Sequence, residues 1–543
     1  MDTFDYVIVG AGSAGSILAN RLSEDPNVTV CVLEAGGTDW NPYIHIPAGF
    51  IKTFYDASVN WNYEMEEGDW TGGRRIFAPR GKTLGGSSSI NGHVYNRGQR
   101  LDFDTWAQFG NRGWGYADVL PYFRRTENRI GSGDDTYRGR EGPVRVTDLE
   151  WRHPLCDAFI AGCLQNGIPR NTDYNGEKQE GVSYVQRTIH KGRRVSTAGA
   201  YLRPAMKRTN LKVLKKAHAT GIVFDGKRAV AIKYRSGGRN GTDKEVRAGR
   251  EIILSSGTYN SPQLLQLSGI GSGDLLQSQG IQVRHALPGV GENLRDHYAP
   301  RLVARVKNIS TINEKSRGLS LAWEVAKWVT MRQGILTLNP TLVYCFWHSG
   351  EAADSSDIQM TFTPASYNDG VQGELEREPG MTIAAWQQRP ESKGYVRIRS
   401  DSPFEQPVIQ PNYLAEEHDR RVLLAALKLA RRLLASEPLK PYYAREDIPG
   451  PHVRTDDELL AVAKQRGTTT FHPMGTCKMG PASDPLAVVD DQLRVHGIDA
   501  LRVIDASIMP TMLSANLNAA AMMIGEKGSD LVRGKEQLPS APV

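Results

Sequence analysis

A glycine-rich turn at residues 10–15 (GAGSAG) constrains the fold of this chain more than any other stretch. Residues 5–9 (DYVIV), just before it, are mostly β-branched or aromatic, which predicts a buried strand of a parallel sheet. Residues 16–22 (SILANRL), just after it, have the apolar spacing of a helix. This order of strand, glycine turn and helix is typical of a site in which the N–H groups at a helix start bind phosphate.

The individual glycines fit that interpretation. We expect Gly10 to allow the tight turn, Gly12 to let a pyrophosphate approach the backbone, and Gly15 to let the helix pack on the strand. A second strand is predicted at residues 28–33 and leads into Glu34, which lies 22 residues after Gly12 (34 − 12) and is placed to accept both hydroxyls of an adenosine ribose. The pattern predicts an ADP-containing dinucleotide, with a purely structural turn as the alternative, and it does not separate NAD from FAD.

The bulk properties exclude several classes of protein. The length of 543 residues predicts two or more domains, because a single hydrophobic core does not grow to that size. The net charge of +6 is small and the Lys and Arg residues are scattered, which argues against nucleic-acid binding. We expect no cleaved signal peptide and no membrane-spanning helix, because Met1 leads directly into the first strand and no uninterrupted apolar run reaches about 18 residues.

The five cysteines predict a reducing compartment, the cytoplasm, rather than a disulfide framework. They are widely spaced and form no Cys-x-x-Cys pair, so we expect buried or spare thiols and no metal site. The residues are Cys31, Cys156, Cys163, Cys345 and Cys477.

A second glycine block, residues 79–92 (PRGKTLGGSSSING), precedes an apolar stretch that is compatible with a helix. Its many backbone donors and small side chains suit close contact with a large flat or anionic ligand. The alternative is a flexible linker, but Leu84 and Ile90 are apolar in a way that Gly/Ser linkers are not.

Residues 10–15, Glu34 and the block at 80–91 together resemble the N-terminal part of the glucose-methanol-choline oxidoreductase family, whose members oxidise alcohols with FAD. Residues 256–271 (SGTYNSPQLLQLSGIG) resemble the second signature of that family. The resemblance extends to residues 293–297 (NLRDH) and to the segment from about 470 to 531, so it spans nearly the whole chain.

The resemblance implies an α/β fold, α+β overall, with two interleaved domains. A Rossmann-like FAD-binding domain would be assembled from residues 1–150, 210–300 and 463–540. A substrate-binding domain, built on an antiparallel sheet flanked by helices, would use residues 151–209 and 301–462.

The resemblance also implies the residues that hold FAD. They are Gly10, Gly12, Ser13, Ala14, Gly15, Glu34, Ala35, Arg80, Gly81, Leu84, Gly85, Gly86, Ser87, Asn91, Gly92, Val94, Ala219, Asp505, Ala506 and Asn518. Some relatives bind FAD covalently through a His just before the Asn of the glycine block. Ile90 stands there in this chain and its alkyl side chain cannot form that bond, so we expect non-covalent FAD.

Alcohol oxidation removes a hydroxyl proton and a carbon-bound hydride. Flavin N5 accepts the hydride, and an imidazole suits the proton because its ordinary pKa of about 6.5 leaves it mostly neutral at pH 7. By resemblance, His472 in residues 471–480 (FHPMGTCKMG) is the base and Asn516, 44 residues later (516 − 472), orients the alcohol. On residue chemistry alone, a His before Pro is more often a structural hydrogen-bonding residue. His93 and His297 match no catalytic position of the family, and we expect them to be structural or to line the pocket.

The substrate is predicted from one further segment. Residues 334–347 (GILTLNPTLVYCFW) resemble the active-site segment in which choline-oxidising members carry a Glu three residues after the Asn, and Leu342 stands in that place. This favours a neutral primary alcohol, aryl or medium-chain, although aromatic faces can also hold a quaternary ammonium.

Several alternatives stay open. The C-terminal motifs resemble most those of choline dehydrogenases, so choline oxidation is one, and a lyase of the same family or a non-catalytic flavoprotein are others. The electron acceptor, dioxygen or a quinone, and the oligomeric state are not determined, and the C-terminal motifs favour a dehydrogenase over an oxidase.

Other stretches carry simpler expectations. Helices are predicted at residues 156–167 and 419–436, and a strand at 395–399. The helical pattern at 321–329, with Trp323 and Trp328, favours an amphipathic helix packed on a core over a peripheral membrane face. Residues 237–243 and 351–357 read as surface loops, and the tail from 534 is expected to fray.

Overall fold

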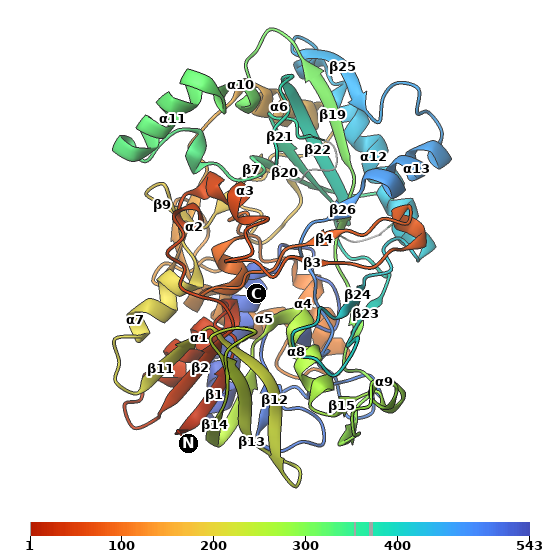
Figure 1. The fold of residues 1–543 in the computed structure, drawn as a ribbon. Coiled ribbons are helices and arrows are strands. Elements are labelled where there is room, and N and C mark those ends of the chain that lie inside the picture. Colours follow the sequence, from red (N-terminus) through yellow and green to blue (C-terminus); the bar gives the residue numbers. More distant parts are fainter. Residues whose placement is uncertain (1, 352–354, 369–372) are drawn as a thin grey trace.

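Two β-sheets, one in each half of the molecule, organise the fold (Figure 1). The structure is a computed structural model and describes residues 2–351, 355–368 and 373–543. The first sheet has the strand order β11 (Leu211–Lys215), β2 (Val30–Glu34), β1 (Thr3–Val9), β14 (Thr242–Leu254), β13 (Arg228–Ser236) and β12 (Ala217–Asp225), with β27 (Leu501–Val503) also paired to β14. Strands β11, β2, β1, β14 and β27 pair in parallel, whereas β12, β13 and β14 pair antiparallel.

The glycine turn joins β1 to α1 (Ser13–Leu22) in the first sheet. Gly10 has a φ of +102°, which favours glycine, and a Cβ on Gly15 would lie 1.9 Å from the Gly10 carbonyl oxygen. Helix α14 (Asn518–Arg533) packs against α1, and a Cβ on Gly525 would lie 3.0 Å from the Cα of Ala14. Small residues therefore let the strand and both helices approach closely.

The second sheet is antiparallel throughout. Its order is β25 (Tyr443–Ile448), β19 (Arg301–Val306), β22 (Gly380–Gln387), β21 (Ile358–Thr363), β20 (Val343–Trp347) and β7 (Gly181–Tyr184). Helices α6 (Pro154–Gln165) and α12 (Glu417–Leu434) pack on it, and Phe159 stacks on Phe362 with 4.5 Å between ring centroids. The predicted fold class is confirmed, while the predicted domain boundaries stay a prediction.

Further elements are short. Helices are α2 (Pro42–His45), α3 (Phe50–Thr53), α4 (Arg100–Gln108), α5 (Tyr116–Thr126), α7 (Arg203–Ala205), α8 (Gly257–Leu267), α9 (Gly273–Ser278), α10 (Ile312–Lys315), α11 (Gly318–Met331) and α13 (Asp456–Arg466). Strands outside the two sheets are β3 (Tyr63–Glu64), β4 (Phe77–Ala78), β5 (Glu127–Ile130), β6 (Val144–Asp148), β8 (Gln186–Arg187), β9 (Ile189–His190), β10 (Arg193–Arg194), β15 (Ile270–Gly271), β16 (His285–Ala286), β17 (Glu292–Leu294), β18 (Tyr298–Ala299), β23 (Gly394–Arg397), β24 (Val408–Gln410) and β26 (Thr468–Thr469).

Predictions for single elements had mixed outcomes. Helices α6 and α12 and strand β23 confirm the three periodic segments. The stretch after the second glycine block is not helical: a 3₁₀ turn at Gly86–Ser89 gives way to irregular chain that runs to α4. The Asn91 side chain accepts a hydrogen bond from the His93 backbone N–H at 3.1 Å, and His93 has a φ of +62°, so the helical path is broken there.

The prediction that residues 321–329 pack on a core is wrong. Helix α11 covers them, but its apolar side chains face solvent and only Glu324 is buried. The Glu324 carboxylate accepts from the backbone N–H of Ile335 at 2.9 Å, and Trp328 Nε1 donates to Gly192 O at 2.9 Å. Polar contacts on one side, rather than an apolar stripe, hold the helix.

The predicted fraying of the C-terminal tail is also wrong. Ala541 N–H donates to Ala117 O at 2.8 Å, and Ser540 Oγ donates to Asp118 at 2.6 Å. The tail thus packs along α5, because its small and apolar residues find partners there. Of the loop predicted at 237–243, residues 237–241 form a turn between β13 and β14, whereas Thr242 and Asp243 already belong to β14. Within the predicted loop at 351–357, residues 352–354 lie outside the described part of the chain.

Candidate active site

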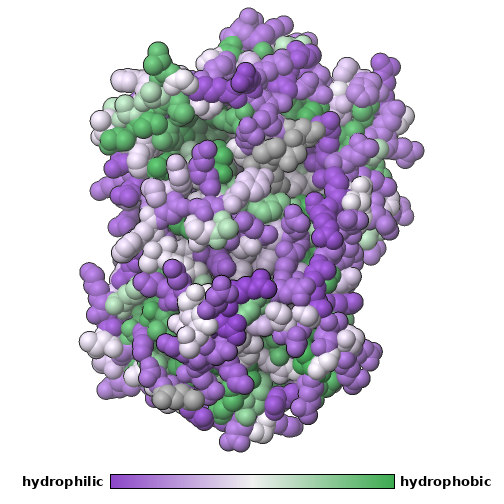
Figure 2. All heavy atoms as spheres, viewed as in Figure 1, coloured by the Kyte–Doolittle hydropathy of each residue, from purple (hydrophilic) through white to green (hydrophobic). Residues whose placement is uncertain are grey.

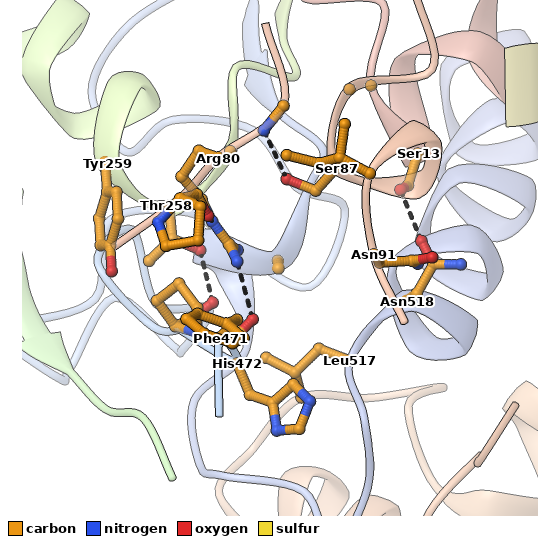
Figure 3. Close-up of a pocket in the computed structure, with 18 of the residues that line it drawn as sticks. Ser13, Arg80, Ser87, Asn91, Thr258, Tyr259, Phe471, His472, Leu517 and Asn518 are labelled. Atoms are coloured by element: carbon orange, nitrogen blue, oxygen red, sulfur yellow. Dashed lines mark hydrogen bonds between the residues drawn. The ribbon is translucent and has the colours of Figure 1, made fainter. Parts of the chain in front are cut away.

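A long cavity of about 420 Å³ runs between the two sheets. Its lining extends from Glu34, where β2 ends, past His472 and Asn516 to strands of the second sheet. Strands of both sheets contribute to its walls, including β12 through Ala219 and β20 through Tyr344. Figure 3 shows part of the lining, with Ser13 and Asn518 facing one another and His472 beside Leu517.

Glu34 closes one end of the cavity as a buried carboxylate. Its two oxygens accept hydrogen bonds from the backbone N–H groups of Ala11 at 2.9 Å and Gly36 at 2.8 Å. Burial raises the pKa of Glu34 to about 7, although both hydrogen bonds act in the opposite direction. The carboxylate is thus held in one orientation at the edge of the cavity, where it can accept further hydroxyl donors.

The middle of the cavity is formed by the start of α1. Gly12 is its N-cap residue, no side chain among the described residues caps it, and the first turn carries no acid. The backbone donors of that turn therefore remain available to an anionic group, aided by the helix dipole. Ser13 Oγ donates to Asn518 Oδ1 at 2.7 Å (Figure 3), which joins the starts of α1 and α14.

The second glycine block lies directly against the first. Gly86 has a φ of +51°, and a Cβ there would lie 2.8 Å from the Cα of Gly12. A carboxylate for ribose, an open helix start for phosphates and a wall of small residues form the set that FAD requires, so the residues fit this cofactor.

The structure brings together most of the residues predicted to hold the cofactor. The lining contains Gly10, Gly12, Ser13, Ala14, Glu34, Ala35, Arg80, Gly81, Gly86, Ser87, Asn91, Gly92, Val94, Ala219, Asp505, Ala506 and Asn518, together with the predicted catalytic pair. Gly15, Leu84 and Gly85 lie outside the lining: Gly15 packs on Gly10, Leu84 is buried in the core, and Gly85 N–H donates to Ala11 O at 2.8 Å. These three support the walls from behind.

Asp296 positions the imidazole of His472 through the backbone. One oxygen of the buried Asp296 carboxylate accepts from the His472 N–H at 2.8 Å and from the His297 N–H at 2.9 Å. The other accepts from the Tyr413 hydroxyl at 2.5 Å and from the Thr469 hydroxyl. Burial raises the pKa of Asp296 despite these hydrogen bonds.

His472 itself makes contacts through both ring nitrogens. Its Nδ1 lies 3.0 Å from His297 Nδ1 and 2.8 Å from Thr470 Oγ1. Its Nε2 lies 2.9 Å from Asn516 Nδ2, and the Tyr344 hydroxyl donates to Asn516 Oδ1 at 2.9 Å. Because Tyr344 donates to the amide oxygen, the amide NH₂ of Asn516 is the group that faces His472.

The hydrogen-bond pattern selects one tautomer of His472. His297 Nε2 lies 2.6 Å from Gln388 O, a carbonyl that can only accept, so Nε2 carries the proton. Burial lowers the pKa of His297 to about 4 and the pKa of His472 well below its usual value, so both rings are neutral at pH 7. A neutral His297 then has a bare Nδ1, which accepts from the N–H at Nδ1 of His472. The Nε2 of His472 is therefore unprotonated and can accept a proton.

The cavity end beyond His472 combines aromatic side chains with threonine hydroxyls, among them Thr341, Thr361, Thr363 and Thr382. Its lining includes Phe50, Phe54, Tyr344, Tyr367, Trp386 and Phe471. The guanidinium of Arg301 lies 5.4 Å from the centre of the Tyr367 ring. Among the described lining residues the carboxylates are Glu34 and Asp505, and Asp505 accepts from the backbone N–H of Gly257 at 2.9 Å, near the cofactor end.

One premise about the substrate is corrected by the structure. Leu342 is fully buried in the hydrophobic core of the second sheet and is not part of the cavity lining. Its neighbours Thr341 and Tyr344 line the cavity instead. The identity of residue 342 therefore carries no information about the charge of the substrate.

Sequence reasoning missed two residues of this site. His297, expected to be structural or pocket-lining, bonds directly to the imidazole of His472 and lies behind the lining. Tyr344 orients Asn516, although it lies far from it in the sequence. Both occur in segments that resemble family motifs, but only the folded structure shows which atoms they contact.

The fold and the site define an FAD-dependent oxidoreductase. The GMC oxidoreductase family models match residues 4–299 and 390–525, and the chain belongs to the GMC oxidoreductase family. It is an alcohol oxidoreductase of that family with FAD as its cofactor.

Similar proteins cover the full length of the chain. The mitochondrial choline dehydrogenase of Homo sapiens is 41% identical over 546 residues, which covers 99% of this chain and 91% of the relative. The oxygen-dependent choline dehydrogenase of Brucella ovis is 42% identical over 535 residues, covering 98% and 96%. The crystal structure of pyridoxine 4-oxidase from Mesorbium loti has a TM-score of 0.87 at 30% identity and covers 98% of this chain and 100% of its own.

Two further features concern possible partners. Across residues 2–351, 355–368 and 373–543, every helix is too short or too polar to cross a bilayer. Within the same ranges, we find no group of three or more His, Cys, Asp or Glu side chains that can hold a metal ion.

Proposed function

We propose that this protein oxidises a neutral primary alcohol, aryl or medium-chain, to the aldehyde, with His472 as the base. The observation that carries the proposal is the bare Nε2 of His472 in the cavity wall, 2.9 Å from the amide of Asn516. Bound FAD supplies the hydride acceptor for this reaction.

Residues of the chain itself accept the hydroxyl proton of the alcohol and hold the alcohol oxygen. Nε2 of His472 accepts the hydroxyl proton of the alcohol once the hydroxyl replaces the Asn516 N–H as the donor to Nε2, while Nδ1–H stays bonded to His297. The amide of Asn516 has two N–H donors; one faces His472 and the other is available to hold the alcohol oxygen. Burial and the nearby Arg80 disfavour a charged imidazole and lower the pKa of His472, so the proton is readily passed on.

We further propose that FAD is bound without a covalent link to residue 90. Ile90 lines the cavity at the position where some relatives carry a His, and its side chain has no nucleophilic atom. Acid precipitation of the purified protein should leave all of the flavin in the supernatant, measured by its absorbance. Flavin that stays with the pellet contradicts the proposal.

The lining supports a neutral substrate. Its aromatic rings offer an apolar surface to an aryl or alkyl group. No described lining residue at the substrate end supplies a carboxylate as countercharge. Choline is the second candidate, because relatives named choline dehydrogenase are about two-fifths identical and aromatic faces attract a quaternary ammonium.

Anaerobic mixing with an alcohol panel tests the substrate class. We expect benzyl alcohol and unbranched C4–C8 alkanols to bleach the oxidised flavin band faster than choline does, at equal concentration. Faster bleaching by choline favours the second candidate, and an unchanged band across the whole panel contradicts alcohol oxidation.

Replacement of His472 tests the base. His472→Ala should retain FAD but slow the bleaching by at least about 10²-fold, the usual scale for loss of a general base. His452→Ala, which changes an exposed residue outside the cavity, is the matched control and should reduce its flavin at the native rate. A native rate in His472→Ala removes this residue from the mechanism.

The same panel in air identifies the electron acceptor. We propose a dehydrogenase that passes electrons to a quinone-like acceptor, with dioxygen as the alternative that the name of the Brucella relatives supports. Peroxide formed in step with aldehyde indicates dioxygen, whereas turnover only with an added quinone indicates a dehydrogenase.

The five free, buried thiols fit the cytoplasm, which we propose as the location.

A further inference from the structure

Helix α11 concentrates exposed apolar side chains. Leu319 is 90% exposed, Trp323 63%, Met331 60% and Val329 57%. We define the α11 patch as its six exposed large apolar residues, Leu319, Leu321, Trp323, Val325, Val329 and Met331. In Figure 2 apolar side chains gather at the upper left of the molecule, where Figure 1 places α11. A contiguous patch of this kind marks a binding surface.

Among the described residues, Glu324 and Trp328 anchor the helix to the rest of the chain. The buried Glu324 accepts from Ile335 N–H at 2.9 Å and from Lys327 Nζ at 2.8 Å, and Trp328 donates to Gly192 O at 2.9 Å. The patch residues project in several directions, because neighbours two positions apart point about 200° away from one another around the helix axis. Figure 1 shows α11 projecting from the body of the molecule.

The surroundings of the patch are basic. Between residues 315 and 333 the charged residues are Lys315, Arg317, Lys327 and Arg332 and a single acid, the buried Glu324. Lys191 and Arg193 are exposed on either side of Gly192, the residue that binds Trp328. The nearest acid before this range, Glu314, caps α10 through Thr311.

We propose that the α11 patch docks on an anionic phospholipid surface. Insertion of α11 into the interfacial region of a bilayer would remove its exposed apolar side chains from water. Tryptophan favours the depth of the lipid headgroups, and flanking Lys and Arg favour anionic lipids. Both features are present here, so charge and shape point to the same occupant.

Docking also concerns the cavity. The chain leaves α11 through a 3₁₀ turn at Ile335–Thr337 and then supplies Pro340 and Thr341 to the cavity wall. Docking of α11 therefore holds the segment that builds the substrate end next to the lipid surface. This inference does not depend on which alcohol is the substrate.

Vesicle co-sedimentation of the FAD-loaded protein tests the proposal. Vesicles of phosphatidylcholine alone are compared with vesicles that also contain phosphatidylglycerol, each at low and high salt. We expect binding to the anionic vesicles, weakened by salt because salt screens the attraction between basic side chains and anionic lipids. The variant Trp323→Ser/Val325→Ser/Val329→Ser should lower the vesicle partition coefficient at least about tenfold, because its apolar contact is removed.

A matched control separates the patch from exposed apolar residues in general. Phe109→Ser/Leu164→Ser changes two residues that are 54% and 47% exposed outside α11 and should bind vesicles as the wild type does. Retained flavin absorbance shows that each variant is folded. Wild-type protein that stays in the supernatant, equal binding to both vesicle types, or native binding by the triple variant overturns the proposal. A wild-type dimer that the triple variant converts to a monomer, without vesicle binding, assigns the patch to self-association and also overturns it.

Discussion

At the scale of single residues, the proton positions of two imidazoles decide what the site can do. Gln388 O holds the proton of His297 on Nε2, so His297 accepts from His472 at Nδ1 and leaves Nε2 of His472 bare. Without His297, the partner of His472 Nδ1 would be Thr470 Oγ1 alone. A hydroxyl can both donate and accept, so it would allow either tautomer of His472. We therefore interpret His297 as a positioning residue for the tautomer of His472.

Replacing His297 tests that interpretation. His297→Leu should retain FAD and slow flavin reduction by about 10²-fold, because either tautomer of His472 is then allowed. His297→Gln should recover most of the rate, since its amide can donate to Gln388 O and accept from His472. Anaerobic stopped-flow reduction gives the rates. Equal rates in the two variants would show that His297 acts only by filling space.

At the scale of elements, two glycines of the turn between β1 and α1 have different roles: one is needed for packing and the other for cofactor binding. Gly15 is required by packing, because its Cβ would meet the Gly10 carbonyl oxygen at 1.9 Å. Packing does not require a glycine at position 12, because the nearest atom to a Cβ placed there, Ser255 O, would lie 3.9 Å away. Gly12 lines the cavity, so a side chain there would enter the space for the phosphates.

Two alanine variants should show this difference. Gly15→Ala should lower the free energy of unfolding by about 3 kcal/mol, the upper range for overpacking a rigid site. Gly12→Ala should change it by less than about 1 kcal/mol, as for an N-cap residue, but weaken FAD binding at least about tenfold. Urea unfolding and flavin-fluorescence titration measure the two quantities. Tight FAD binding by Gly12→Ala would contradict the assignment of the phosphate site.

Sequence periodicity predicted elements best where they are buried on one side. Helices α6 and α12 pack an apolar face on the second sheet, so their residues carry the helical spacing. Helix α11 has an apolar pattern too, and periodicity cannot tell whether the chain itself covers it. The tail after 534 lacks periodicity, yet contacts with α5 order it.

At the scale of the whole molecule, folding buries several histidines in their neutral form. Burial lowers the pKa of His218 and His297 to about 4 and that of His93 and His472 well below 6.5. The unfolded chain binds protons on these residues below about pH 6.5, whereas the folded protein does not. The raised pKa of Glu34, about 7, acts in the opposite direction between about pH 4.5 and 7.

Stability should therefore fall on mild acidification. Four histidines outweigh the two carboxyls with raised pKa values, Glu34 and Asp296, so the free energy of unfolding should decrease as pH falls from about 6.5 toward 4. Each histidine contributes up to about 1.4 kcal/mol per pH unit in that window. Melting temperatures of the FAD-loaded protein between pH 7.5 and pH 5, buffers matched for ionic strength, check the direction. A melting temperature that stays constant or rises toward pH 5 contradicts it.

The sequence alone determined the cofactor class, the family resemblance and most cofactor-binding positions, because these depend on residues close together in short motifs. Glycine turns and a strand-ending acid such as Glu34 act through local backbone geometry. Only the tertiary structure decided which atoms His472 contacts, that Leu342 faces the core, and that α11 is left uncovered. Those outcomes depend on contacts between residues far apart in the chain, which no local pattern encodes.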